Sequence, residues 1–261
     1  MEIKQCCADF YENDAVKLIF GQSLHPGGLD LTKELGERLG IKENDKVLDI
    51  ACGTGTSAIF LAKNFGCKVT GIDLAKKNIE EAINNSHKEN VSGLVDFKFG
   101  DAENIDFENE SFDFVISECS FCLFPDKKEA SKEMHRVLKK GGKLGMSDVI
   151  IRGELPEKMK SILYKFICIE DAKSEKEYEN ILKNSGFNNF NFEDRKDDVL
   201  NLLEGIRKKI FFLELAKGFD KIDIKIDPVD IRDNLKGIKG CVDNNIMSYI
   251  LITAEKQFDG R

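Results

Sequence analysis

Short apolar runs alternate with amphipathic stretches along the first 150 residues of the chain. The apolar runs predict strands at residues 46–52, 67–75, 95–101, 112–118 and 143–151. Helical spacing occurs between them at residues 57–65, 76–90 and 126–140, and the last of these helices is expected to stop at the glycine pair 141–142. Strands that alternate with helices of about ten to fifteen residues predict βαβ units and a parallel sheet.

The pattern changes after residue 151. A helix is predicted at residues 174–187, and alternating strands are predicted at 190–194 and 246–255. The stretch between these strands has helical pieces and could form a lid, a cap or an interface. We therefore expect one α/β domain, made of an N-terminal lid segment, a core, a helical insertion and a final strand with its tail: residues 1–32, 33–195, 196–245 and 246–261.

The composition is that of an ordinary soluble globular protein, with 41% hydrophobic and 33% charged residues. A net charge of -8 argues against a nucleic-acid partner, because phosphate binding needs a basic face. It also argues against a polybasic membrane anchor. The charged N-terminus lacks the apolar region of a signal peptide, and no window approaches the roughly 18 apolar residues of a membrane span. We expect a cytoplasmic protein with no membrane partner, and its oligomeric state stays open.

A glycine loop follows the first predicted strand, in the sequence VLDIACGTGTSA. Gly53 and Gly55 would let the backbone approach a ligand closely, without an intervening side chain. With Ala58 in the third glycine position, the loop also fits a dinucleotide fingerprint loosely. However, Asp49 precedes the loop on the strand. A carboxylate there would repel a pyrophosphate and would suit a ligand that carries an ammonium group.

Two further acids end the next strands of the predicted sheet. Asp73 ends the second strand, where an acid can bind both hydroxyls of a ribose. Asp101 ends the third strand, beside the same crevice. Together with Asp49, these acids around a glycine loop describe a ligand with adenosine at one end and a cation at the other.

The segments VLDIACGTGTSA, GIDLA, GDAEN, DFVISE and HRVLKKGGKLGMSDV resemble the class I S-adenosylmethionine-dependent methyltransferases, over roughly residues 30 to 190. The resemblance implies a doubly wound, seven-stranded, mostly parallel Rossmann-like sheet that ends in an antiparallel hairpin carrying the helical insertion. It implies S-adenosyl-L-methionine as the methyl-donating co-substrate. The residues implied to bind it are Asp49, Ala51, Gly53, Thr54 and Gly55 around the methionine end, Asp73 and Leu74 at the ribose, Asp101 and Ala102 at the adenine, and Glu118.

Two cysteines in ISECSFC, Cys119 and Cys122, lie just past the fourth predicted strand. They could be a redox pair, half of a zinc site with Cys6 and Cys7, a trap for a soft substrate, or packing residues. Within the superfamily, the chain is most similar to the arsenite methyltransferases. That resemblance implies that Cys119 and Cys168 bind trivalent arsenic, with Cys7 or Cys6 as the third thiol, whereas Cys122 is expected to pack.

Thiols are apt ligands for this soft element, and the arsenic lone pair could attack the methyl group without a general base. The leading expectation is therefore a methyltransferase for thiol-bound trivalent arsenic or a similar soft substrate. One alternative is a small organic O, N or C nucleophile, for which the candidate general bases are His25, Glu118 and Asp148. His25 and Tyr11 could then line the site. A third hypothesis is a non-catalytic metalloid sensor on the same fold.

Overall fold

The computed structural model describes residues 25–160, 171–215 and 228–257. Seven strands form one sheet in the order β3-β2-β1-β4-β5-β7-β6. The first five pair in parallel, and β7 runs antiparallel to both of its neighbours, β5 and β6. The strand bounds are β1 Lys46–Ile50, β2 Lys68–Asp73, β3 Val95–Phe99, β4 Phe112–Glu118, β5 Leu138–Ile151, β6 Phe187–Asp194 and β7 Met247–Lys256. The expected fold class is confirmed.

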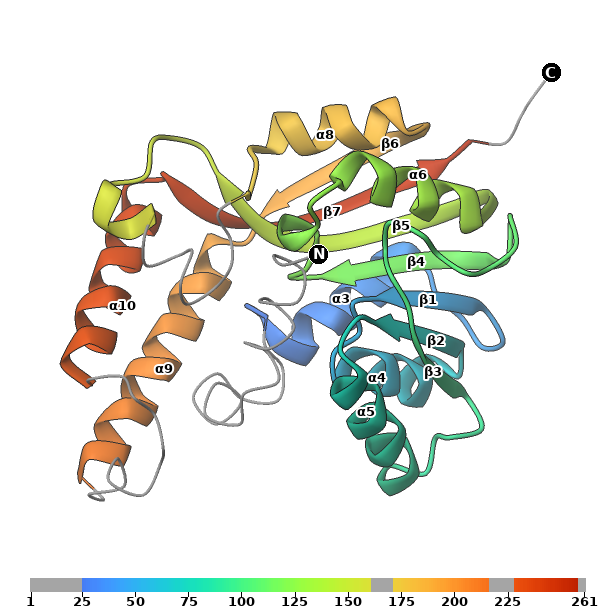
Figure 1. Cartoon of the computed structure of the whole chain (residues 1–261), viewed down its shortest axis with the longest axis horizontal. Helices are drawn as coiled ribbons and strands as arrows, with labels where there is room; N and C mark the ends of the chain where they lie inside the picture. Colours follow the sequence, from blue (N-terminus) through green and yellow to red (C-terminus); the bar gives the residue numbers. More distant parts are fainter. Residues whose placement is uncertain (1–24, 161–170, 216–227, 258–261) are drawn as a thin grey trace.

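Helices cover both faces of this sheet. One face carries α3 (Gly28–Leu39), α4 (Thr56–Phe65) and α5 (Lys76–Lys88), and the other carries α6 (Lys127–Val137) and α8 (Glu175–Asn184). The expected insertion contains two helices, α9 (Lys196–Leu215) and α10 (Pro228–Asp243), which pack on each other and on β7. They extend away from the sheet side by side (Figure 1). No helix within the described ranges is long and apolar enough to cross a membrane.

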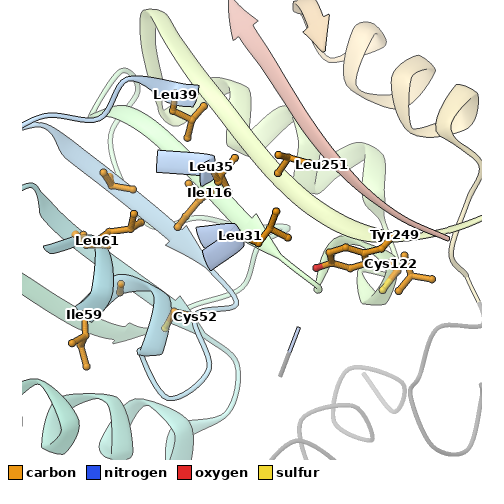
Figure 2. Packing of buried hydrophobic residues seen from close by; sticks show 14 of the residues in the cluster. Leu31, Leu35, Leu39, Cys52, Ile59, Leu61, Ile116, Cys122, Tyr249 and Leu251 are labelled. Atoms are coloured by element: carbon orange, nitrogen blue, oxygen red, sulfur yellow. The ribbon is translucent and has the colours of Figure 1, made fainter. Parts of the chain in front are cut away.

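A row of leucines fixes α3 on the sheet. Leu31, Leu35 and Leu39 recur every four residues, so they share one face of the helix, and each is 1% exposed. Gly145 of β5 makes room for them, since a Cβ there would lie 2.6 Å from Leu35 Cδ1. Figure 2 shows the three leucines along α3, beside Ile116 and Leu251. Burial of each such side chain contributes about 1.5–3 kcal/mol.

The position of α3 has a consequence for the N-terminal segment. Because the helix begins at Gly28, the boundary expected at residue 32 falls inside it. The helix brings His25, just ahead of its first turn, and Thr32 to the edge of the sheet where the parallel strands end. Residues expected in a separate lid are thus anchored to the core.

The glycine pair after α6 corrects one expectation. The helix ends at Val137, and β5 already begins at Leu138, which pairs with Phe112. The next pair joins Lys143 to Phe114, so the intervening residues of β5 form a bulge. Gly141 adopts a φ of 74°, which a bulge needs and a β-carbon disfavours. The glycines therefore bend a strand, and the predicted helix stop at this pair was wrong.

Candidate active site

One pocket opens at the carboxyl ends of β1, β2 and β4, where open α/β sheets bind their ligands. Parallel pairing aligns Asp49 of β1 with Gly71 of β2 and Ile116 of β4, so the residues that follow reach the same edge. Nine of the ten expected cofactor residues line the pocket: Asp49, Ala51, Gly53, Thr54, Asp73, Leu74, Asp101, Ala102 and Glu118. The tenth, Gly55, is not part of the lining, and its contact with the cofactor stays a prediction.

The two glycines of the loop serve different purposes. A Cβ on Gly55 would lie 2.6 Å from Phe97 Cζ and 3.0 Å from the Cβ of Ala82, so this glycine lets the loop pack on β3 and α5. A Cβ on Gly53 would meet nothing within 4 Å, and Gly53 lines the pocket. At Gly53 a ligand can therefore approach the loop backbone without an intervening side chain.

Asp73 connects this loop to the start of α5. Its Oδ2 accepts a hydrogen bond from the Gly53 backbone nitrogen at 2.9 Å, and its Oδ1 accepts one from the Ala75 nitrogen at 2.8 Å. These bonds fix the plane of the carboxylate at the pocket wall. A carboxylate held in this way can accept hydrogen bonds from the two hydroxyls of a ribose.

Asp49 is buried beneath the pocket at 2% exposure, and its Oδ2 has no hydrogen-bond partner among the described residues. Burial, with Glu118 and Asp73 nearby, raises the pKa of this carboxyl well above its usual value. A buried carboxylate is costly unless a cation pairs with it. S-adenosyl-L-methionine brings both an ammonium and a sulfonium group, so the residues present fit this co-substrate.

The sequence did not indicate Asn78, which also lines the pocket. It lies in the first turn of α5, is 4% exposed, and its Oδ1 has no partner in the described part of the chain. A buried amide oxygen without a partner is costly, so this atom is available to a ligand donor. One signal could have revealed it, namely a polar residue on the buried face of the helix that follows the ribose acid. The pocket lining also includes Cys52 and Ser57.

Glu118, at the end of β4, is held by hydrogen bonds from two helices, α3 and α4, which cover the same face of the sheet. Ser57 of α4 donates its hydroxyl to Oε2 at 2.6 Å, and Thr32 of α3 lies 3.0 Å from the same oxygen. His25 Nε2 lies 3.7 Å from Oε2, and both side chains are buried. The carboxylate thus has a fixed place at the pocket wall, opposite the histidine.

Cys119 lines the pocket, as its position after β4 predicted. Its φ of 52° turns the chain sharply, and its backbone nitrogen donates to Ser147 O at 2.7 Å. Burial and the Asp148 carboxylate raise the pKa of the thiol, with a hydrogen bond to Tyr249 acting in the opposite direction. The side chain is therefore a neutral thiol at neutral pH.

Cys122 is buried beneath the loop, as expected, and does not line the pocket. Its backbone nitrogen donates to Asp148 Oδ2 at 3.0 Å, and its thiol also bonds to this carboxyl. Asp148 is itself outside the pocket lining, and burial raises its pKa. Of the three expected general-base candidates, only His25 and Glu118 reach the pocket.

Several expected residues lie outside the described ranges, namely Cys6, Cys7, Tyr11 and Cys168. The arsenic-binding thiols and the zinc alternative therefore stay hypotheses. Within the described ranges, no cluster of three or more histidine, cysteine or acidic side chains is arranged to hold a metal ion.

Comparison with known proteins agrees with this site. A family model described as a methyltransferase domain matches residues 41–186. The methyltransferase GfsG of Streptomyces halstedii is 29% identical over 182 residues, covering 64% of this chain and 66% of that protein. The O-methyltransferase resE of Aspergillus sclerotiorum is 27% identical over 227 residues, covering 87% of this chain and 81% of that protein.

The solved structures include a similar enzyme, phosphoethanolamine N-methyltransferase 2 of Haemonchus contortus, in complex with S-adenosyl-L-methionine. Its TM-score is 0.81 at 25% identity; the match covers 94% of this chain and 56% of that one, so the chain spans about half of that enzyme. The fold and the pocket define a class I methyltransferase, and the chain belongs to the methyltransferase-domain family. It is an S-adenosylmethionine-dependent methyltransferase.

Proposed function

We propose that this enzyme methylates a hydroxyl or amine of a small organic acceptor that is neutral or cationic. The charge of the pocket carries the proposal. Five acidic residues line it, and the described lining contains no lysine or arginine: Asp49, Asp73, Asp101, Glu103 and Glu118. An anionic acceptor would lose its hydration beside these carboxyl groups without gaining a lysine or arginine to pair with.

The relatives support an organic acceptor. One is named as an O-methyltransferase and another as a phosphoethanolamine N-methyltransferase. Phosphoethanolamine carries a negatively charged phosphate, which the acidic pocket disfavours. We therefore expect phosphoethanolamine to be a poor acceptor for this enzyme. The contrast between a phosphorylated amine and the same amine without phosphate therefore tests the role of pocket charge.

Thiol-bound trivalent arsenic is the second candidate, and the observation that favours it is Cys119 in the pocket wall. The raised pKa of this thiol means that bonding to arsenic requires loss of a proton held more tightly than in a free thiol. None of the relatives named above is described as acting on arsenic. We therefore place this acceptor second.

A labelled methyl donor tests both candidates in one assay. The enzyme is incubated with labelled S-adenosyl-L-methionine and, separately, with catechols, ethanolamine, phosphoethanolamine, or arsenite plus a thiol. We expect label in a catechol or in ethanolamine, and little in phosphoethanolamine. Methylated arsenic species, with no labelled organic product, would reverse the order of the two candidates. Stoichiometric arsenic binding without methylation would support the sensor hypothesis.

A further inference from the structure

One buried side chain in the pocket has an unusual hydrogen-bonding state. His25 is 7% exposed, and its Nδ1 lies 3.1 Å from Pro26 O. A carbonyl oxygen can only accept, so Nδ1 must carry the proton of this bond. In the neutral ring, Nε2 then bears a lone pair. This atom has no hydrogen-bond partner among the described residues, although His25 lines the pocket.

Glu118 faces that lone pair at 3.7 Å, measured from Oε2 to Nε2. This distance is too long for a hydrogen bond but short enough for strong attraction to a cation. The carboxylate is kept in place by the hydroxyls of Ser57 and Thr32. A proton that arrived on Nε2 would therefore create an imidazolium directly beside a fixed negative charge.

We propose that His25 is the general base of methyl transfer, and that Glu118 positions it and stabilises its protonated form. The inference rests on the proposed hydroxyl or amine acceptor. Nε2 takes the acceptor proton, and the acceptor lone pair forms the new bond to the methyl carbon. The carbon–sulfur bond of the donor breaks with its electron pair on sulfur, which leaves a neutral thioether. One positive charge thus leaves sulfur and one appears on His25, beside Glu118.

The other groups nearby are less suited to take this proton. The Oε2 atom of Glu118 already accepts the Ser57 hydroxyl at 2.6 Å and lies 3.0 Å from the hydroxyl of Thr32. The carboxyl of Asp148 lies outside the pocket lining and accepts two backbone hydrogen bonds, from Cys122 and Val149. Cys119 keeps its own proton, because burial and Asp148 raise the pKa of its thiol. Asp49 Oδ2 and Asn78 Oδ1 also lack partners, but the first is assigned to the cofactor cation and an amide oxygen is not basic, so within the described lining His25 presents the only unpartnered ring nitrogen.

Two acceptors of similar shape and different acidity test the role of His25. The His25→Asn variant keeps a donor near Pro26 O and loses the basic nitrogen. We expect the rate of catechol methylation to fall about a hundredfold or more. The rate with 4-nitrocatechol, which gives up its proton more readily, should fall far less, by about tenfold at most. Equal losses with both acceptors, or no loss with either, would overturn the proposal.

Exposed His87 supplies the matched control, and His87→Gln should change neither rate. S-adenosylhomocysteine affinity, measured by calorimetry, should be retained within about threefold in His25→Asn. This result would separate loss of a base from collapse of the pocket. If the affinity for S-adenosylhomocysteine and the rate of catechol methylation fell by similar factors in His25→Asn, His25 would be a binding residue. That result would contradict its role as a general base.

A spectroscopic measurement decides the state of His25 without any acceptor. The chain has three histidines, so nitrogen-15 spectra of the S-adenosylhomocysteine complex contain three imidazole patterns, and His25→Asn assigns the one from His25. We expect the neutral ring to carry its proton on Nδ1. A neutral ring with its proton on Nε2 would overturn the proposal. Failure of every organic acceptor would instead remove the proposed function, while this measurement still reports on His25.

Discussion

Ser57 donates its hydroxyl to Glu118 across 2.6 Å, although the two residues are 61 positions apart in the sequence. Ser57 belongs to the first turn of α4, which the glycine loop opens, and Glu118 ends β4. The bond therefore joins the part of the pocket that the cofactor loop forms to the part that faces His25.

We expect Ser57→Ala to lower the free energy of unfolding by about 1.5–3 kcal/mol, because a buried carboxylate loses a charge-assisted hydrogen bond. Urea unfolding monitored by circular dichroism measures this change. Ser92→Ala, at an exposed turn, is the matched control and should have no effect beyond about 0.5 kcal/mol. If Ser57→Ala changed the free energy of unfolding no more than Ser92→Ala does, the hydrogen bond between Ser57 and Glu118 would not contribute to the stability of the fold.

The buried carboxyl of Asp49 should oppose folding and support binding. Its pKa is raised in the folded state, so the unfolded chain ionises first as pH rises. The resulting loss of stability begins above the unfolded pKa and is complete above the folded one. Asp49→Asn should therefore raise the ligand-free melting temperature, on the order of a few degrees, at high pH, and this gain should vanish as pH falls.

The same variant should bind S-adenosylhomocysteine about tenfold more weakly or worse, because a charge-assisted contact to the ligand is lost. Thermal unfolding and calorimetry across a pH series measure both effects, with exposed Asp106→Asn as the control. If the gain in melting temperature of Asp49→Asn did not change with pH, ionisation of Asp49 would not be the cause of the loss of stability at high pH.

Alanine substitutions of the two loop glycines should have different effects, one mainly on folding stability and the other mainly on cofactor binding. Gly55→Ala forces a Cβ into Phe97 and Ala82 at a φ of 79°, and should cost about 2 kcal/mol or more of folding free energy. Gly53→Ala meets open space at a φ of 52°, so only backbone strain of about 1–2 kcal/mol is expected. Its Cβ enters the pocket, however, and should weaken S-adenosylhomocysteine binding about tenfold or more.

Chemical unfolding and calorimetry of both variants separate the two effects. Gly93→Ala, where a Cβ meets nothing and φ is not positive, serves as the control. Retained cofactor affinity in Gly53→Ala would mean that the ligand does not approach this part of the loop.

Serine substitutions of the two cysteines that follow β4 should have different effects. Cys122→Ser puts a hydroxyl in a fully enclosed site and should cost stability, by about 1–3 kcal/mol, more than activity. Cys119→Ser should leave S-adenosylhomocysteine binding intact and abolish methylation of arsenite if arsenic is a substrate, because a hard ligand replaces a soft one. Arsenite methylation at the unchanged rate in Cys119→Ser would remove the thiol-trap hypothesis.

The parallel sheet and the acidic residues of the pocket were accessible from the sequence for a physical reason. Asp49, Asp73 and Asp101 each lie near the end of a parallel strand, and parallel strands bring their carboxyl ends to one edge. Local spacing was therefore enough to place them together. The same argument placed Cys119 at this edge, and the separate expectation that Cys122 packs agrees with its burial.

Contacts between residues far apart could not be derived in this way. Thr32 and Glu118 are separated by 86 positions, and their contact depends on how the Leu31, Leu35 and Leu39 face seats α3. The unpartnered atoms of His25 and Asn78 are likewise set by packing. Gly141 illustrates a local ambiguity, since a glycine after a helical pattern can end a helix or shape a bulge.

The place of β7 has a consequence for synthesis on the ribosome. Met247–Lys256 forms the last strand in chain order among the described residues, yet it lies inside the sheet, between β5 and β6. Strands β1 to β5 can pair as soon as they leave the exit tunnel, whereas β6 has no neighbour to join until β7 has been translated. A nascent chain halted before Met247 would present one unpaired edge of β5 and the wholly unpaired strand β6 to chaperones and to other chains.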